Sequence, residues 1–194
     1  LALLARNKKE NRKIYRPNNQ LPFISIIMSV HNEEKVLTKK IRSIYNTIYP
    51  INRFEVLIGS DASVDGTDRI CRVYNNNYQN FHYYPFTIRQ GKPGIINRLA
   101  EQASGEILVL TDAKVFLSNN TLFELIKHFR NPDIHIVGGN ILNEKISKDG
   151  ISVQEKAFMS REITMKYQEG LIWGKTIGVY GAIYAIRKPS YTPV

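Results

Sequence analysis

Acidic side chains stand directly after three apolar runs of this sequence, and a lysine opens a fourth polar segment. Glu33, Asp61 and Asp112 each follow such a run within three residues. A carboxylate can accept a hydrogen bond from the N–H of a uracil or from ribose hydroxyls, and Asp112 also offers the oxygen ligand that Mg²⁺ or Mn²⁺ takes. Lys92 lies at the start of an expected helix, where its ammonium group and the helix dipole suit a phosphate.

The elements that would position these residues alternate along the chain. β-Branched apolar runs and helical periodicity predict strands and helices in turn, joined by short loops. This alternation predicts an α/β fold with a mostly parallel sheet and helices on both faces. Ligands of such sheets bind outside the carboxyl ends of the strands, so His31, Glu33, Asp61 and Asp112 are expected at one edge. The expected strands are 23–30, 54–59, 81–86, 106–110, 134–137 and 182–186, and the expected helices are 33–47, one around 70–74, 91–103, 121–129 and 153–167.

Structural readings compete with the functional ones at several polar positions. Asp65, before Gly66 and Thr67, is expected to cap a helix rather than to bind a ligand. Glu34 suits the first turn of a helix through the helix dipole, and His31 could simply fill the rim of the sheet. A ligand-binding site is favoured because three acids, Glu33, Asp61 and Asp112, each follow a predicted strand.

Five motifs in order make the chain resemble the family 2 glycosyltransferases, which have the GT-A fold of nucleotide-diphospho-sugar transferases. The resemblance runs from about Leu21 to Arg187. It rests on residues 23–34 with their Asn-Glu turn, on Ser60-Asp-Ala-Ser-Val-Asp-Gly-Thr67, on Gly91-Lys92 with Asn97, on the strand leading to Thr111-Asp112, and on residues 181–187.

The resemblance implies a role for each matching residue. His31 and Glu33 would line the nucleotide pocket, Asp61 would accept the uracil N–H, and Lys92 would lie near the nucleotide. Asp112 would contact the ribose or the metal-bound diphosphate. The implied reaction moves a sugar from a UDP-sugar to an acceptor hydroxyl with inversion, in polysaccharide or glycolipid synthesis, with a carbohydrate or lipid-linked acceptor.

Two departures from the family pattern affect the expected chemistry. Lys114 stands where the family motif has a second acid, and a protonated lysine cannot ligate a metal; an Mg²⁺ or Mn²⁺ cofactor is therefore an expectation that Lys114 opposes. The family's catalytic base lies beyond the strand that ends near Arg187, where this chain has only Lys-Pro-Ser-Tyr-Thr-Pro-Val. No catalytic residue is assigned, and the base is expected beyond Val194. Residues 173–186 are expected to form part of the acceptor wall. Trp173 could stack there on a sugar face, although packing as core or lid is the favoured interpretation of a single aromatic residue.

Charge and composition limit the class of protein. The formal net charge is +10, and six basic residues gather within residues 6–16. Residues 1–20 are interpreted as a basic linker and residues 21–194 as a glycosyltransferase domain truncated at its C-terminus. The apolar start before the basic cluster resembles the end of a membrane helix, which predicts a longer protein at the cytoplasmic face of the membrane and a soluble fragment here. The single cysteine, Cys71, excludes an internal disulfide, and no nucleic-acid-binding signature is present.

Two other functions stay open. A nucleotide-sugar-binding module of the same fold that has lost catalysis is the alternative that Lys114 favours. A nucleotidyltransferase is disfavoured, because such enzymes carry a glycine-rich basic loop after the first strand, and this chain has Ser-Val-His-Asn-Glu-Glu there.

Overall fold

The computed structural model describes residue 15 and residues 20–141, 164–166, 168–170, 172 and 181–193. Residues 14–139 and 181–194 form one compact unit, which we call the sheet unit, and residues 1–13 with 140–180 form a second. In the second unit, residues 164–166 and 168–170 are helical. Trp173 and most of the helix expected at 153–167 lie outside the described residues. The division into 1–20 and 21–194 stays a prediction.

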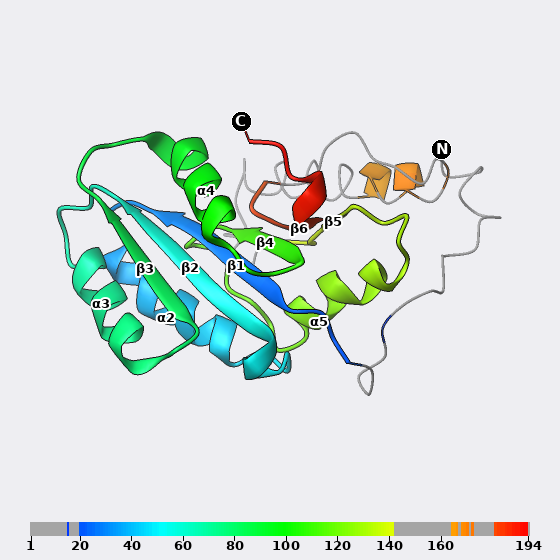
Figure 1. The fold of residues 1–194 in the computed structure, drawn as a ribbon, viewed down its shortest axis with the longest axis horizontal. Helices are drawn as coiled ribbons and strands as arrows, with labels where there is room; N and C mark the ends of the chain where they lie inside the picture. Colours follow the sequence, from blue (N-terminus) through cyan, green and yellow to red (C-terminus); the bar gives the residue numbers. More distant parts are fainter. Residues whose placement is uncertain are drawn as a thin grey trace, which may run out of the picture. The chain divides into compact units, whose positions relative to one another are not determined.

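Six strands of the described chain form one sheet in the order β3-β2-β1-β4-β6-β5 (Figure 1). The strands are β1 (Ile24–Val30), β2 (Phe54–Asp61), β3 (Phe81–Phe86), β4 (Ile107–Thr111), β5 (Ile136–Gly138) and β6 (Ile183–Arg187). β1 runs parallel to β2 and β4, and β2 runs parallel to β3. β6 is antiparallel to both β4 and β5. The predicted α/β class with a mostly parallel sheet is confirmed, and the antiparallel strands lie at one side of it.

Helices cover both faces of this sheet, as predicted. α4 (Gly91–Gln102) lies on one face, and α2 (Glu34–Tyr45) and α3 (Thr67–Asn77) lie on the other (Figure 1). α5 (Thr121–Ile126) continues as a 3₁₀ turn, η2 (Lys127–Arg130), where a single helix over 121–129 was expected. Two further 3₁₀ turns are η1 (Ile51–Arg53) and η3 (Lys188–Ser190). None of the helices within the described ranges has the length and apolarity needed to cross a membrane.

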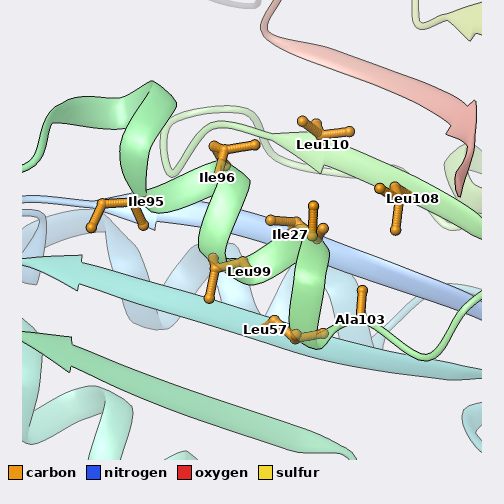
Figure 2. Packing of buried hydrophobic residues seen from close by; sticks show 9 residues of the cluster. Ile27, Leu57, Ile95, Ile96, Leu99, Ala103, Leu108 and Leu110 are labelled. Atoms are coloured by element: carbon orange, nitrogen blue, oxygen red, sulfur yellow. The ribbon is translucent and has the colours of Figure 1, made fainter. Parts of the chain in front are cut away.

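The packing of α4 fixes where the site can form. Ile95 and Leu99 of α4 lie over Ile27, Leu57 and the neighbouring strand residues in one buried cluster (Figure 2). Full burial of each such side chain stabilises the fold by about 1.5–3 kcal/mol. This cluster holds the first turn of α4 next to the carboxyl ends of β1 and β2.

Candidate functional site

The predicted site residues form one connected group at the carboxyl ends of β1, β2 and β4. After β1, the His31 ring nitrogen Nδ1 lies 2.8 Å from the backbone oxygen of Asp61, the last residue of β2. The Asp61 carboxylate in turn accepts hydrogen bonds from the start of α4. Lys92 of α4 pairs with Asp112 after β4, and Lys114 reaches back to Glu33, with Nζ and Oε1 3.5 Å apart. All five predicted donor-binding residues therefore belong to one chain of contacts.

Unusual backbone conformation marks the same edge of the sheet. Asn32 and Ala62 both have φ of 54°, and Gly91 has φ of 76°; they are the positive-φ residues of the described chain. Each lies next to a predicted site residue. The left-handed conformation disfavours an alanine by roughly 1–2 kcal/mol, and such conformations gather at functional sites. These positive-φ residues therefore set the direction of the turns that carry the predicted site residues, at some cost in stability.

Asp61 is nearly inaccessible, with 2% of its surface exposed. One carboxylate oxygen accepts from the N–H of Gln90 at 2.7 Å, and the other accepts from the N–H of Gly91 at 3.0 Å and from Arg89 Nε at 3.1 Å. Burial by itself raises the pKa of the Asp61 carboxyl, but these hydrogen bonds and the Arg89 charge outweigh it and hold the pKa below its usual range. The carboxylate thus caps the N-terminus of α4, the helix end that the sequence offered to a phosphate.

Arg89 and His31 form the accessible side of this arrangement. Arg89 Nη1 lies 2.7 Å from His31 Nε2, and the Asn32 amide nitrogen lies 3.2 Å from the same atom. Because Nε2 faces two N–H donors, the ring proton belongs on Nδ1, which donates to the Asp61 backbone oxygen. The Arg89 side chain remains 58% exposed. Its guanidinium is therefore held in place by two contacts while most of its surface faces solvent.

Two further ion pairs join the loop after β4 to its neighbours. Lys92 contacts Asp112, and both side chains are about half exposed, at 54% and 40%. The Lys114 side chain is more exposed than its partner Glu33. Exposed pairs of this kind contribute only about 0–1 kcal/mol each. Both ammonium groups can leave their carboxylates for an anionic ligand at little cost.

A lysine that the sequence reading missed lies beneath the same loop. Lys40 of α2 has no exposed surface, and its Nζ donates to Thr111 Oγ1 at 2.9 Å and to the backbone oxygen of Val115. Burial lowers the pKa of Lys40 to about 7, and the nearby Asp112 carboxylate opposes part of that shift. The sequence feature that could have identified Lys40 is its position on the apolar face of α2, with Leu37 and Ile44. Arg89 was not predicted as a site residue either.

The residues given structural interpretations serve as links between α2 and α3. Asp65 accepts from the backbone N–H of Thr67 at 2.9 Å and of Glu34 at 3.2 Å. Glu34 in return accepts from the N–H of Gly66 at 2.6 Å. The N-cap position of α3 is Gly66, so Asp65 lies one residue outside the cap position predicted for it. Its carboxylate still satisfies the first-turn N–H of Thr67 and so has a structural role at this helix end.

The residues present do not fit a divalent cation held by Asp112. Within the described ranges, no group of three or more His, Cys, Asp or Glu residues lies close enough to hold a metal ion. Asp112 already pairs with the ammonium of Lys92, and position 114 carries a second ammonium. The buried Lys40 also acts electrostatically on Asp112. Positive groups thus surround the carboxylate that a cation would need, and they suit a diphosphate better.

Two solved glycosyltransferase structures share the fold of this chain. A mannosyltransferase of Pyrobaculum calidifontis, PcManGT in complex with GDP-Man and Mn²⁺, matches with a TM-score of 0.72 at 23% identity, over 92% of this chain and 48% of that one. TarS 1–349 of S. aureus in complex with UDP-GlcNAc matches with a TM-score of 0.53 at 24% identity, over 66% of this chain and 38% of that one. The fold is of the GT-A glycosyltransferase type, as the sequence predicted.

The sequence comparisons then define the family. The family model described as Glycosyl transferase family 2 matches residues 25–191, and the chain belongs to this family. Glycosyltransferase AglE of Haloferax volcanii is 31% identical over 62% of the chain. The β-monoglucosyldiacylglycerol synthase of Trichormus variabilis is 29% identical over 60% of the chain. The matched parts span 40% and 25% of these two relatives.

Proposed function

We propose that this chain is the donor-binding part of an inverting glycosyltransferase that moves a sugar from a UDP-sugar to an acceptor hydroxyl, in polysaccharide or glycolipid synthesis. Family membership supports the transferase class. The glycolipid synthase among the relatives and the UDP-GlcNAc complex of TarS support the acceptor and donor classes. The observation that carries the proposal is the connected group of Glu33, Asp61 and Asp112 with their basic partners.

In this proposal, the Asp61–Arg89 pair recognises the base. The chain fills three of the roughly four lone-pair positions of the Asp61 carboxylate. Because this carboxylate is only 2% exposed, the fourth position becomes reachable for a base N–H when the exposed Arg89 side chain shifts. Arg89 adds N–H donors beside it. An N–H flanked by a carbonyl, as uracil has, is complementary to an acceptor next to a donor. His31 supports the guanidinium from the other side.

Lys92 and Lys114 receive the diphosphate in the same proposal. On binding, each ammonium exchanges its partly exposed carboxylate partner for phosphate oxygens, which neutralises charge that grows as UDP leaves. Asp112 and Glu33 are then released toward the ribose and sugar hydroxyls. The acceptor hydroxyl attacks the anomeric carbon from the face opposite to UDP. Its proton passes to a general base, which we expect beyond Val194. We also expect the full-length protein to associate with a membrane.

Calorimetry of the purified chain tests the proposal directly. We expect UDP to bind at least about tenfold more tightly than ADP, because adenine lacks an N–H flanked by a carbonyl. We also expect UDP to bind more tightly than GDP, the preference that the proposed UDP-sugar donor requires. Equal affinities for UDP, GDP and ADP would contradict the base assignment, and no binding of any nucleoside diphosphate would overturn the donor-binding function.

A catalytically degenerate nucleotide-sugar-binding module remains the second candidate, because Lys114 occupies the position of the family's second acid. Transfer or hydrolysis of UDP-sugar by a longer chain that includes the residues after Val194 distinguishes the two functions. Tight UDP binding with no turnover of any UDP-sugar would favour the binding module.

A further inference from the structure

The buried Lys40 occupies a position where its helix otherwise carries apolar residues. It shares the inner stripe of α2 with Leu37, Ile41 and Ile44, all fully buried. A buried polar group destabilises a fold unless hydrogen bonds compensate for its lost water. A methionine or leucine would fill the same space without that penalty, so the lysine needs a reason that packing does not give.

The contacts of Lys40 bridge the two ends of one turn. Its Nζ donates to Thr111 Oγ1, at the end of β4, and to the backbone oxygen of Val115. Between these residues, the Val115 N–H donates to the Asp112 backbone oxygen at 3.1 Å. The turn is therefore closed by its own backbone and held from beneath by the Lys40 amino group.

The residues carried by this turn are Asp112 and Lys114, both on the side of the predicted diphosphate. Their only ties to neighbouring elements that the structure describes are the ion pairs with Lys92 and Glu33 and the Asp112 backbone N–H bond to Ala182. Ion pairs at exposed positions fix a loop weakly. Besides the buried side chain of Ala113, Lys40 anchors the turn from beneath. It reaches there from α2, the helix that begins directly after Glu33.

We propose that Lys40 is the positioning residue of the Thr111–Val115 turn, and that its bridge orients Asp112 and Lys114 toward the diphosphate of the nucleotide donor. This inference rests on the proposed function. It assigns to Lys40 no contact with the ligand. Its effect is confined to the phosphate half of the site, because the base half, Asp61 with Arg89, is held by the start of α4.

The experiment compares UDP with uridine, which lacks the diphosphate. Lys40→Met keeps the length and apolar bulk of the side chain and removes the bridge. We expect its UDP affinity by calorimetry to fall roughly tenfold, the effect of one well-placed charged hydrogen bond. Its uridine affinity, followed by ligand-observed NMR, should match that of the wild type. Lys35→Met is the matched control, since Lys35 is an exposed lysine of the same helix, and it should change neither affinity.

A second variant keeps the inference testable if Lys40→Met does not fold. Thr111→Val retains Lys40 and the shape of residue 111 but removes one acceptor of the bridge, and it should weaken UDP binding and leave uridine binding unchanged. Equal loss of UDP and uridine binding, or unchanged UDP binding, in the folded variants would overturn the inference. Wild-type protein that binds neither ligand would instead overturn the proposed function on which it rests.

Discussion

Three acidic residues end neighbouring strands here, and their exposure separates their roles. Asp61 is buried and uses its carboxylate to hold residues 89–91. Asp112 and Glu33 are more exposed and hold lysines by weak ion pairs. A buried carboxylate with a lowered pKa shapes the site, whereas the exposed pairs can exchange partners when a ligand arrives.

Replacing Asp61 should damage nucleotide binding more than the same change at Asp65. In Asp61→Asn, the new amide turns N–H groups toward the N–H donors of Gln90, Gly91 and Arg89, which loosens the turn. We expect UDP affinity to fall roughly tenfold or more. Asp65→Asn should leave UDP affinity within about twofold and lower the free energy of unfolding by roughly 1 kcal/mol through the α3 terminus. Calorimetry and urea unfolding measure both effects, and equal losses of affinity would contradict the assignment.

Lys114 should determine whether UDP binding responds to a divalent cation. In the wild type, ammonium groups surround Asp112, so we expect the UDP affinity in excess EDTA and in Mn²⁺ to agree within about twofold. Lys114→Asp restores a second carboxylate oxygen ligand, and its UDP affinity should rise clearly when Mn²⁺ is added. Lys127→Asp controls for the change in net charge. Lys127 lies on η2, pairs with Glu124 of α5 and takes no part in the contacts of Asp112. Strong Mn²⁺ dependence of the wild type would show that the lysines do not replace the cation.

At the scale of elements, α4 links the core to the site. Its Ile95 packs directly over Gly59 of β2, and a methyl group at Gly59 would overlap Ile95 Cγ2. The same helix begins with the backbone N–H groups that hold Asp61 and carries Lys92. A displacement of α4 therefore alters the base and phosphate halves of the site together.

Gly59→Ala should consequently weaken both stability and nucleotide binding. Overpacking of this kind costs typically about 1–3 kcal/mol, and the shift of α4 should reduce the affinities for UDP and for uridine by similar factors. This pattern differs from the one expected for Lys40→Met, where only UDP binding changes. Urea unfolding and ligand-observed NMR measure the two effects. Normal uridine binding in a destabilised Gly59→Ala protein would show that the core accommodates the methyl group without moving α4.

For the whole molecule, the pattern of strands and helices could be predicted because strands buried on both faces of a sheet require runs of apolar residues. The β1 and β2 runs are mostly apolar and buried along nearly their whole length, and the acids that follow these runs stood out for that reason. The structural partners of those acids were not readable, because they depend on contacts between distant segments. Arg89 lies 28 residues after Asp61 and meets it only once β3 and α4 are in place. The role of Asp61 as a helix cap was hidden for the same reason.

The pH dependence of stability offers a test on the whole molecule. The pKa of Lys40 is about 7 in the fold and 10.5 as its reference value. Between these values the unfolded chain binds a proton at Lys40 that the folded chain lacks, so the free energy of unfolding rises with pH, by up to about 1.4 kcal/mol per pH unit. Below about pH 7 both states are protonated and this contribution is flat.

The measurement belongs between about pH 7 and pH 8.5, because Cys71 opposes the effect at higher pH. Burial raises the pKa of the Cys71 thiol from 9.0 to about 12, so the unfolded chain loses that proton first and stability falls above about pH 9. Within the lower window, urea unfolding should show the wild type gaining up to about 2 kcal/mol relative to Lys40→Met. Lys35→Met should follow the wild type. Parallel stability curves for wild type and Lys40→Met would mean that Asp112 keeps the buried ammonium charged throughout, and that the bridge beneath the turn is an ionic one.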